Sequence, residues 1–108
     1  MPFDLLIRGG LLVDGTGSAG RLADVGVLGD RILAIGDLSA VAPTDIPLVI
    51  DASGLVVAPG FIDMLGQSEY NVLVDNRAAS KITQGITTEI TGEGGSIAPV
   101  NARMIADG

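Results

Sequence analysis

One stretch decides the fold: Gly54-Leu-Val-Val-Ala-Pro-Gly-Phe-Ile-Asp63, with its continuation Met64-Leu-Gly-Gln-Ser-Glu69. An apolar run from Leu55 to Ala58 stops at Pro59-Gly60, and a second apolar run ends in the carboxylate of Asp63. Proline lacks the N–H group that a strand ladder needs, and glycine adopts unusual backbone dihedrals. The pair therefore predicts a corner between two short strands.

The second strand is predicted over residues 61–65 and has the composition of a buried strand, since Asp63 is its one polar residue. Polar side chains follow its end at Gln67, Ser68 and Glu69. Parallel barrels keep their chemistry at the carboxyl ends of their strands, so these three residues are candidates for a substrate or active-site loop. A polar cap on a buried strand is the competing interpretation. Asp63 is expected to bond neighbouring backbone.

The chain before this corner has the pattern of an all-β segment. Short strands are predicted over residues 5–7, 11–13, 23–28, 31–35, 48–50 and 55–57. Gly9-Gly10 separates the first two, and the Gly29-Asp30 pair between apolar segments predicts a tight hairpin. Residues 37–47 contain two prolines and predict a surface loop.

The pattern changes after residue 60. A helix is predicted from a cap at Asp75 or Asn76 to about Gln84, with Gly85 as its stop. The β-branched run 86–91 predicts a strand, and the Gly92-Glu-Gly-Gly-Ser96 loop and a helix over 101–106 follow. The order strand, helix, strand with short joins indicates a parallel βαβ unit.

Composition restricts the class of protein. The 108 residues, with 47% hydrophobic content, correspond to one globular domain's worth of chain, whereas a (β/α)8 barrel needs roughly 200 residues. A net charge of −7 argues against a nucleic-acid partner. No apolar run approaches the ~20 residues of a membrane helix, and no signal peptide is apparent, so a cytoplasmic location is expected. The chain contains neither cysteine nor histidine.

Gly15-Thr-Gly-Ser-Ala-Gly20 matches the spacing of a dinucleotide-binding loop. That function requires a helix to begin there, so that its N-terminal amides face a pyrophosphate. The following residues instead predict a strand, so the motif is interpreted as a turn. Gly92-Glu-Gly-Gly-Ser96 is left open between an active-site loop, with amides that could bind a substrate carboxylate, and a plain strand-to-helix turn.

The run Val56-Val-Ala-Pro-Gly-Phe-Ile-Asp63 closely resembles the join between the β-sandwich and the first barrel strand of the amidohydrolase superfamily, and its continuation resembles the D-aminoacylase branch. The resemblance implies a mainly β fold with a βα start. Residues 1–58 would form part of a composite, urease-like β-sandwich, and 59–108 the first βαβ unit of an incomplete (β/α)8 barrel. It also implies a full-length hydrolase that cleaves a non-peptide C–N amide bond, of N-acyl (D-)amino acids, with zinc as a cofactor.

The resemblance also supplies a test of the metal site. Members of the superfamily carry His-x-His at the end of the first barrel strand, and here these positions hold Leu65 and Gln67. Relatives place a cysteine in the loop after the second strand, where this chain has Gly94, preceded by Glu93 as a weak candidate ligand. We therefore predict no catalytic residue and no metal on this chain alone, which is expected to be inactive. Gln67, Ser68, Glu69 and Glu93 remain candidates for the substrate loop.

A second hypothesis belongs to another class: a non-catalytic β-sandwich module that acts by oligomerising or docking to a partner. Two parallel strands cannot close a barrel, so Ile62, Leu65, Ile86 and Ile90 would lack opposing strands. Self-association through these unpaired strands is therefore expected. Under the first hypothesis, the partner of the full-length protein is a small-molecule amide substrate.

Overall fold

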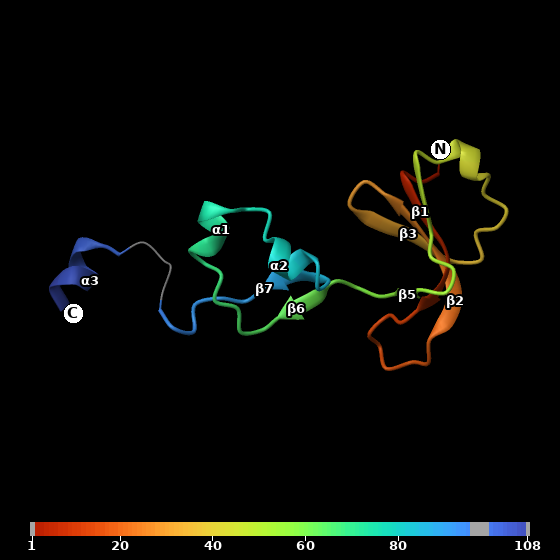
Figure 1. Ribbon diagram of the computed structural model, residues 1–108. Helices are drawn as coiled ribbons and strands as arrows, with labels where there is room; N and C mark the ends of the chain where they lie inside the picture. Colours follow the sequence, from red (N-terminus) through yellow and green to blue (C-terminus); the bar gives the residue numbers. More distant parts are fainter. Residues whose placement is uncertain (1, 96–99, 108) are drawn as a thin grey trace. The chain divides into compact units, whose positions relative to one another are not determined.

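The computed structural model describes residues 2–95 and 100–107. The chain forms two compact units, Met1–Pro59 and Gly60–Gly108, which we call unit 1 and unit 2 (Figure 1). The boundary between the units falls at the Pro59-Gly60 corner.

Unit 1 contains one five-stranded sheet, in the order β3-β2-β1-β4 with β5 also paired to β1 (Figure 1). Strand β1 is antiparallel to β2 and parallel to both β4 and β5, while β2 and β3 are antiparallel. The bounds are β1 Leu5–Leu12, β2 Arg21–Leu28, β3 Arg31–Gly36, β4 Leu48–Asp51 and β5 Val56–Val57.

The predicted hairpin is confirmed: Gly29-Asp30 joins β2 to β3. Gly29 has a φ of +59°, a conformation that favours glycine, and its N–H donates to the Asp4 carboxylate at 2.7 Å. The turn thus has both the backbone freedom and the acceptor that it needs.

The predicted break at Gly9-Gly10 is wrong, because β1 continues through it. The register with β2 shifts between Ile7 and Gly10, and Gly9 lies at a φ of +68°. The carboxylate of Asp24, on the neighbouring strand, accepts the N–H of Gly9 at 2.8 Å. A β-bulge, with its freed amide satisfied by a side chain, therefore replaces the predicted interruption.

Residues 37–47 form a cover over one face of the sheet rather than a purely surface loop. Ile46 is 7% exposed and packs with Phe3 and Leu6, and Leu38 and Val41 pack against the same cluster. This loop includes the short 3-10 helix η1, Pro43–Asp45. The interpretation as a surface loop came from the polar and proline residues and missed these apolar anchors.

The other face of the sheet presents two rows of aliphatic side chains, because cross-strand partners share a face. The strand pairing aligns one row across four strands: Ile35, Val25, Ile7 and Ile50. A second row lies beside it: Ile32, Val27, Leu5 and Leu48. Val25 packs with Ile7 and Val27, but the outer members of the rows remain 42–64% exposed.

Unit 2 contains two short parallel strands, β6 Phe61–Asp63 and β7 Ile86–Glu89, paired side by side. The described helices of this unit are α1 Asn71–Val74, α2 Ala79–Ile82 and α3 Ala102–Asp107 (Figure 1). The predicted βαβ order and the parallel direction of the two strands are confirmed. No helix in the described part of the chain is long and apolar enough to cross a membrane.

A helix, α2, does lie within the range predicted from Asp75 or Asn76 to about Gln84, but its predicted start and cap are wrong. Asp75 ends α1, and its carboxylate accepts the Arg77 N–H at 3.1 Å, a local turn that competes with helix. Ala78, which precedes α2, has a left-handed φ of +47°. Gly85 does serve as the stop, with a φ of +79° and its N–H donated to the Ile82 carbonyl at 2.9 Å.

The prediction that the strand after Gly60 is buried is also wrong for this chain. Phe61 is 60% exposed, Ile62 58% and Met64 70%. The physical reason is the small number of partners: among the described residues of unit 2, β7 is the one strand beside β6, and the helices are four to six residues long. A buried-type composition needs cover on both faces of the sheet, and these residues do not supply it.

Candidate functional site

The candidate site lies at the carboxyl ends of the parallel strands β6 and β7, where two loops meet. The first is loop 64–70, which leaves β6, and the second is loop 90–95, which leaves β7. Parallel strands bring such ends to one edge of a sheet, which explains why residues distant in sequence come together here.

Hydrogen bonds of the four predicted site residues join loop 64–70 to β7 and loop 90–95. The Gln67 side-chain amide donates to the Glu93 carboxylate at 3.4 Å, and the Glu69 carboxylate accepts the N–H of Gly92 at 3.1 Å. The N–H of Ser68 donates to the Glu89 carboxylate at 2.9 Å. Ser96, the last residue of the predicted glycine-rich loop, lies outside the described residues.

Glu89 is a residue that the sequence analysis missed. It closes β7, pairs with Asp63 in the strand register, and is half-buried. A signal was present, since a carboxylate in a run of threonine and isoleucine at the end of a predicted parallel strand occupies the position where polar groups gather. The run was interpreted from its β-branched content alone.

Asp63 behaves as expected and has an additional partner. Its carboxylate accepts the N–H of Leu65 at 3.1 Å and forms an ion pair with the Lys81 ammonium of α2 at 2.6 Å. The hydrogen bond from Lys81, followed by that from Leu65, lowers the pKa of the Asp63 carboxyl. The same bond to Asp63 raises the pKa of Lys81. Asp63 therefore ties β6 to α2 and to the start of loop 64–70, which agrees with the expectation that it bonds neighbouring backbone.

The two loops border a hollow of about 290 Å³ lined by Gln67, Glu69, Tyr70, Gly94 and Gly95. The lining offers a neutral amide, a carboxylate, a phenol and glycine backbone. Among the described residues no basic side chain lines it, and Glu93 lies against Gln67 beside it. These groups can accept hydrogen bonds from a small polar molecule, whereas the carboxylates disfavour an anionic group.

The described residues do not fit a zinc centre. The His-x-His positions hold Leu65, which cannot ligate, and Gln67, whose amide contacts Glu93. Among residues 2–95 and 100–107, no group of three or more His, Cys, Asp or Glu side chains is arranged to hold a metal ion. Glu93 therefore has no companion ligands in this part of the chain.

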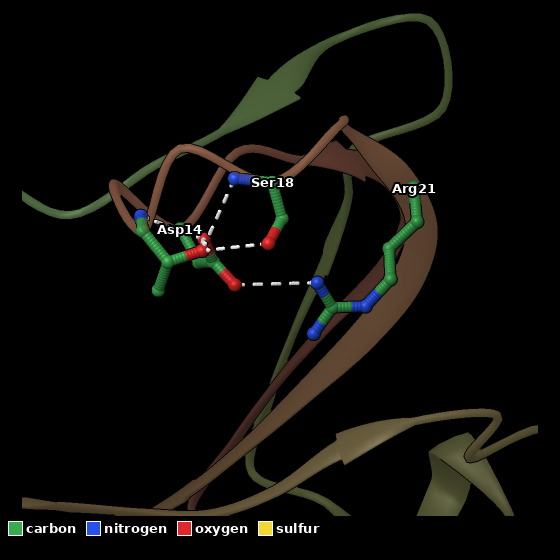
Figure 2. A network of polar contacts seen from close by, with 4 residues as sticks. Asp14, Ser18 and Arg21 are labelled. Atoms are coloured by element: carbon green, nitrogen blue, oxygen red, sulfur yellow. Dashed lines mark hydrogen bonds and ion pairs between the residues drawn. The ribbon is translucent and has the colours of Figure 1, made fainter.

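The glycine motif at 15–20 is the turn that was predicted. Asp14 accepts hydrogen bonds from the Thr16 amide at 3.0 Å and hydroxyl at 2.6 Å, and its other oxygen pairs with Arg21 at 3.2 Å (Figure 2). The bonds from Thr16, and then that from Arg21, lower the pKa of Asp14 to about 2. Strand β2 begins at Arg21, so no helix follows the motif and a pyrophosphate site is not formed.

Comparison with known proteins identifies relatives, although no family model matches the chain. D-aminoacylase of Alcaligenes xylosoxydans xylosoxydans is 54% identical over 101 residues, which are 92% of this chain and 20% of that protein. N-acyl-D-glutamate deacylase of the same organism is 49% identical over 92 residues, 85% of this chain and 18% of that protein. The chain thus spans about one fifth of the length of these relatives.

Solved structures agree with the sequence comparison. A crystal structure of D-aminoacylase, described as defining a novel subset of amidohydrolases, matches 95% of this chain and 22% of its own with a TM-score of 0.82 at 46% identity. N-acyl-D-glutamate deacylase from Bordetella bronchiseptica, complexed with zinc and a phosphonate inhibitor that mimics the tetrahedral intermediate, matches with a TM-score of 0.85 at 41% identity, over 95% of this chain and 21% of its own.

These matches confirm the resemblance to the amidohydrolases inferred from residues 56–69. The chain corresponds to the N-terminal segment of the D-aminoacylase branch, the N-acyl-D-amino-acid deacylases. Another structure of D-aminoacylase concerns its binuclear metal centre, so the branch contains metal-dependent enzymes. The coarse fold, mainly β with few helices, agrees with the same relatives.

Proposed function

We propose that this chain is the N-terminal segment of a hydrolase that cleaves the amide bond of N-acyl-D-amino acids. The observation that carries the proposal is the 54% identity to D-aminoacylase over 92% of the chain. In the reaction, water adds to the acyl carbon, the C–N bond breaks, and a carboxylic acid and a free D-amino acid form. The hollow beside Gln67 and Glu69 would hold part of the substrate.

The part of the substrate that meets this chain is argued from charge. Glu69 and Glu93 border the hollow and no basic side chain lines it, so the substrate's free carboxylate would bind elsewhere in the full-length protein. Gln67 and Ser68 are neutral and can bond the amide or the acyl group. Since Leu65 and Gln67 do not fit zinc, any zinc of the full-length protein needs ligands from outside the described residues.

The finer architecture is part of the proposal. We infer that the sheet of unit 1 is one layer of a β-sandwich, because its two aliphatic rows form an apolar face whose outer members are 42–64% exposed. We likewise infer that β6 and β7 begin a (β/α)8 barrel. Their parallel pairing and the exposure of Phe61 and Ile62 support this, since further strands would cover those side chains.

The test uses the complete gene product. We expect release of free amine from at least one of N-acetyl-D-glutamate, N-acetyl-D-aspartate and N-acetyl-D-leucine, and none from the L enantiomers. Zinc content by plasma mass spectrometry accompanies the assay. Failure to hydrolyse all three D substrates, with the enzyme folded by circular dichroism, would overturn the proposal.

A second candidate, a module that self-associates, is favoured by one observation: Phe61, Ile62, Leu65 and Ile90 of unit 2 are each 48–60% exposed. Chain 1–108 by itself is therefore expected to elute from a sizing column as a dimer or larger species, and to hydrolyse no N-acyl-D-amino acid. A stable monomer at micromolar concentration would contradict the association, and turnover would contradict the predicted inactivity.

A further inference from the structure

Two backbone amides of loop 64–70 donate hydrogen bonds to β7 and to loop 90–95, away from the substrate hollow. The N–H of Gly66 donates to the Ile90 carbonyl at 2.9 Å, and the N–H of Ser68 donates to the Glu89 carboxylate at 2.9 Å. The two bonds fix the backbone on both sides of Gln67. Since Gln67 lines the hollow, its placement depends on these neighbours.

The carboxylate of Glu89 also packs against the backbone of Gly66. A Cβ atom on Gly66 would lie 1.9 Å from both Glu89 Cγ and Oε1, far inside contact distance. Gly66 is buried and Glu89 half-buried. The absence of a side chain at 66 is therefore what lets the Glu89 carboxylate reach the amide of Ser68.

We propose that Glu89 is a positioning residue that sets the backbone of residues 66–68 and thereby presents Gln67 and Ser68 to the substrate. It acts through the Ser68 amide and not through contact with the reacting atoms. The proposal rests on the proposed function for its effect on turnover, while its effect on the loop is independent of it.

The experiment compares Glu89→Ala, Glu89→Gln and a control, Thr88→Ala, in the complete gene product. Thr88 is an exposed neighbour on the same strand. Amide hydrogen exchange of peptides covering residues 64–71 measures the loop, and steady-state kinetics with the N-acetyl-D-amino acid that the enzyme hydrolyses measure KM and kcat separately.

We expect Glu89→Ala to speed exchange at Ser68 about tenfold or more, because the amide loses its acceptor. KM should rise about tenfold with kcat within about threefold, as lost substrate binding predicts. Glu89→Gln keeps the shape and an acceptor oxygen, so it should restore both values to near those of the wild type. Thr88→Ala should change neither.

Unchanged exchange at Ser68 in Glu89→Ala would overturn the proposal, as would faster exchange with unchanged KM. A fall in kcat alone would indicate a general loss of folded enzyme and would also count against it. If Glu89→Ala does not fold, Glu89→Gln and Glu89→Asp carry the test, because the shorter Asp should release the Ser68 amide while keeping the charge. If the wild type hydrolyses no substrate, the proposed function fails, and exchange in the same variants still decides whether Glu89 holds the loop.

Discussion

Units 1 and 2 differ in how much apolar surface each buries with its own residues. Among the described residues, the buried hydrophobic side chains all lie in unit 1: Phe3, Leu6, Leu12, Ala23, Val25, Ile46 and Ala52. In unit 2 the strand residues Phe61 and Ile62 are more than half exposed. Unit 1 pairs neighbouring strands through a short hairpin and folds a loop over them, whereas the described residues of unit 2 leave the apolar side chains of its parallel strand pair uncovered.

The largest expected effect tests this difference directly. Two alanine substitutions are compared. Leu6→Ala changes a side chain with no exposed surface, and Ile62→Ala changes one that is 58% exposed. Leu6→Ala should lower the free energy of unfolding of unit 1 by about 2–5 kcal/mol, because it leaves a cavity in the core. Ile62→Ala should cost less than about 1 kcal/mol in chain 1–108. Urea unfolding of both variants measures the values, and equal costs would contradict the comparison.

Gly66→Ala should have the next largest effect, and in unit 2. The added Cβ meets the Glu89 side chain, so the free energy of unfolding should fall by about 1–3 kcal/mol. The double variant Gly66→Ala/Glu89→Ala removes the obstacle and should recover part of the loss. A double-mutant cycle by urea unfolding checks the coupling, and additive costs would show that the two residues do not touch.

Asp24→Ala tests how unit 1 holds loop 37–47 against its sheet. The Asp24 carboxylate accepts the N–H of Gly9 at 2.8 Å and that of Leu38 at 2.9 Å. Its loss leaves the bulge and the loop 37–47 without these acceptors, at a cost of about 1–3 kcal/mol. Hydrogen exchange at Gly9 and Leu38 should quicken together. The exposed Asp30→Ala is the matched control and should change neither amide.

The smallest expected effect concerns the Asp63–Lys81 pair in unit 2. Its bonds lower the pKa of Asp63 below the ordinary 3.8, so its stabilisation is present above that pH and is lost as the pH falls through the folded-state pKa. The pKa of Lys81 is raised above 10.5, so its contribution is present below that pH and is lost as the pH rises through the higher value. Lys81→Met removes the partner of Asp63, so the stability of unit 2 should depend less on pH between about pH 5 and pH 2. Hydrogen exchange measured across this pH range gives that dependence. An unchanged pH dependence of stability in this range would contradict the pairing.

The parts of the fold that were predicted correctly depend on local chemistry. The Gly29-Asp30 turn, the stop at Gly85 and the break between strands at Pro59-Gly60 follow from residues that allow or forbid particular backbone conformations. The errors have a different origin. The bulge at Gly9 depends on Asp24, fifteen positions away, and the late start of α2 accompanies the turn that Asp75 makes with Arg77.

The candidate site divides in the same way. Gln67, Ser68, Glu69 and Glu93 could be proposed from their positions after two predicted strands, since parallel strands end at one edge. The position of Glu89 at the end of a predicted strand was a signal that was missed, but its bond to the Ser68 amide, like that of Lys81 to Asp63, appears only in the tertiary structure. Those contacts join residues 18 to 21 positions apart.

The amino-acid sequence alone indicated the change from an all-β segment to a strand-helix-strand segment near Pro59-Gly60, the similarity to the D-aminoacylase branch of amidohydrolases, and the lack of histidine and cysteine in the chain. Turn chemistry, apolar periodicity and residue identity are properties of neighbouring positions, which can be read along a chain. The tertiary structure alone decided which carboxylates accept hydrogen bonds from which amides and how loop 37–47 covers its sheet. It also decided that the Glu89 side chain packs against the backbone of Gly66. These depend on distances between residues that are remote in sequence, and only the pairing of strands brings such residues within hydrogen-bond range.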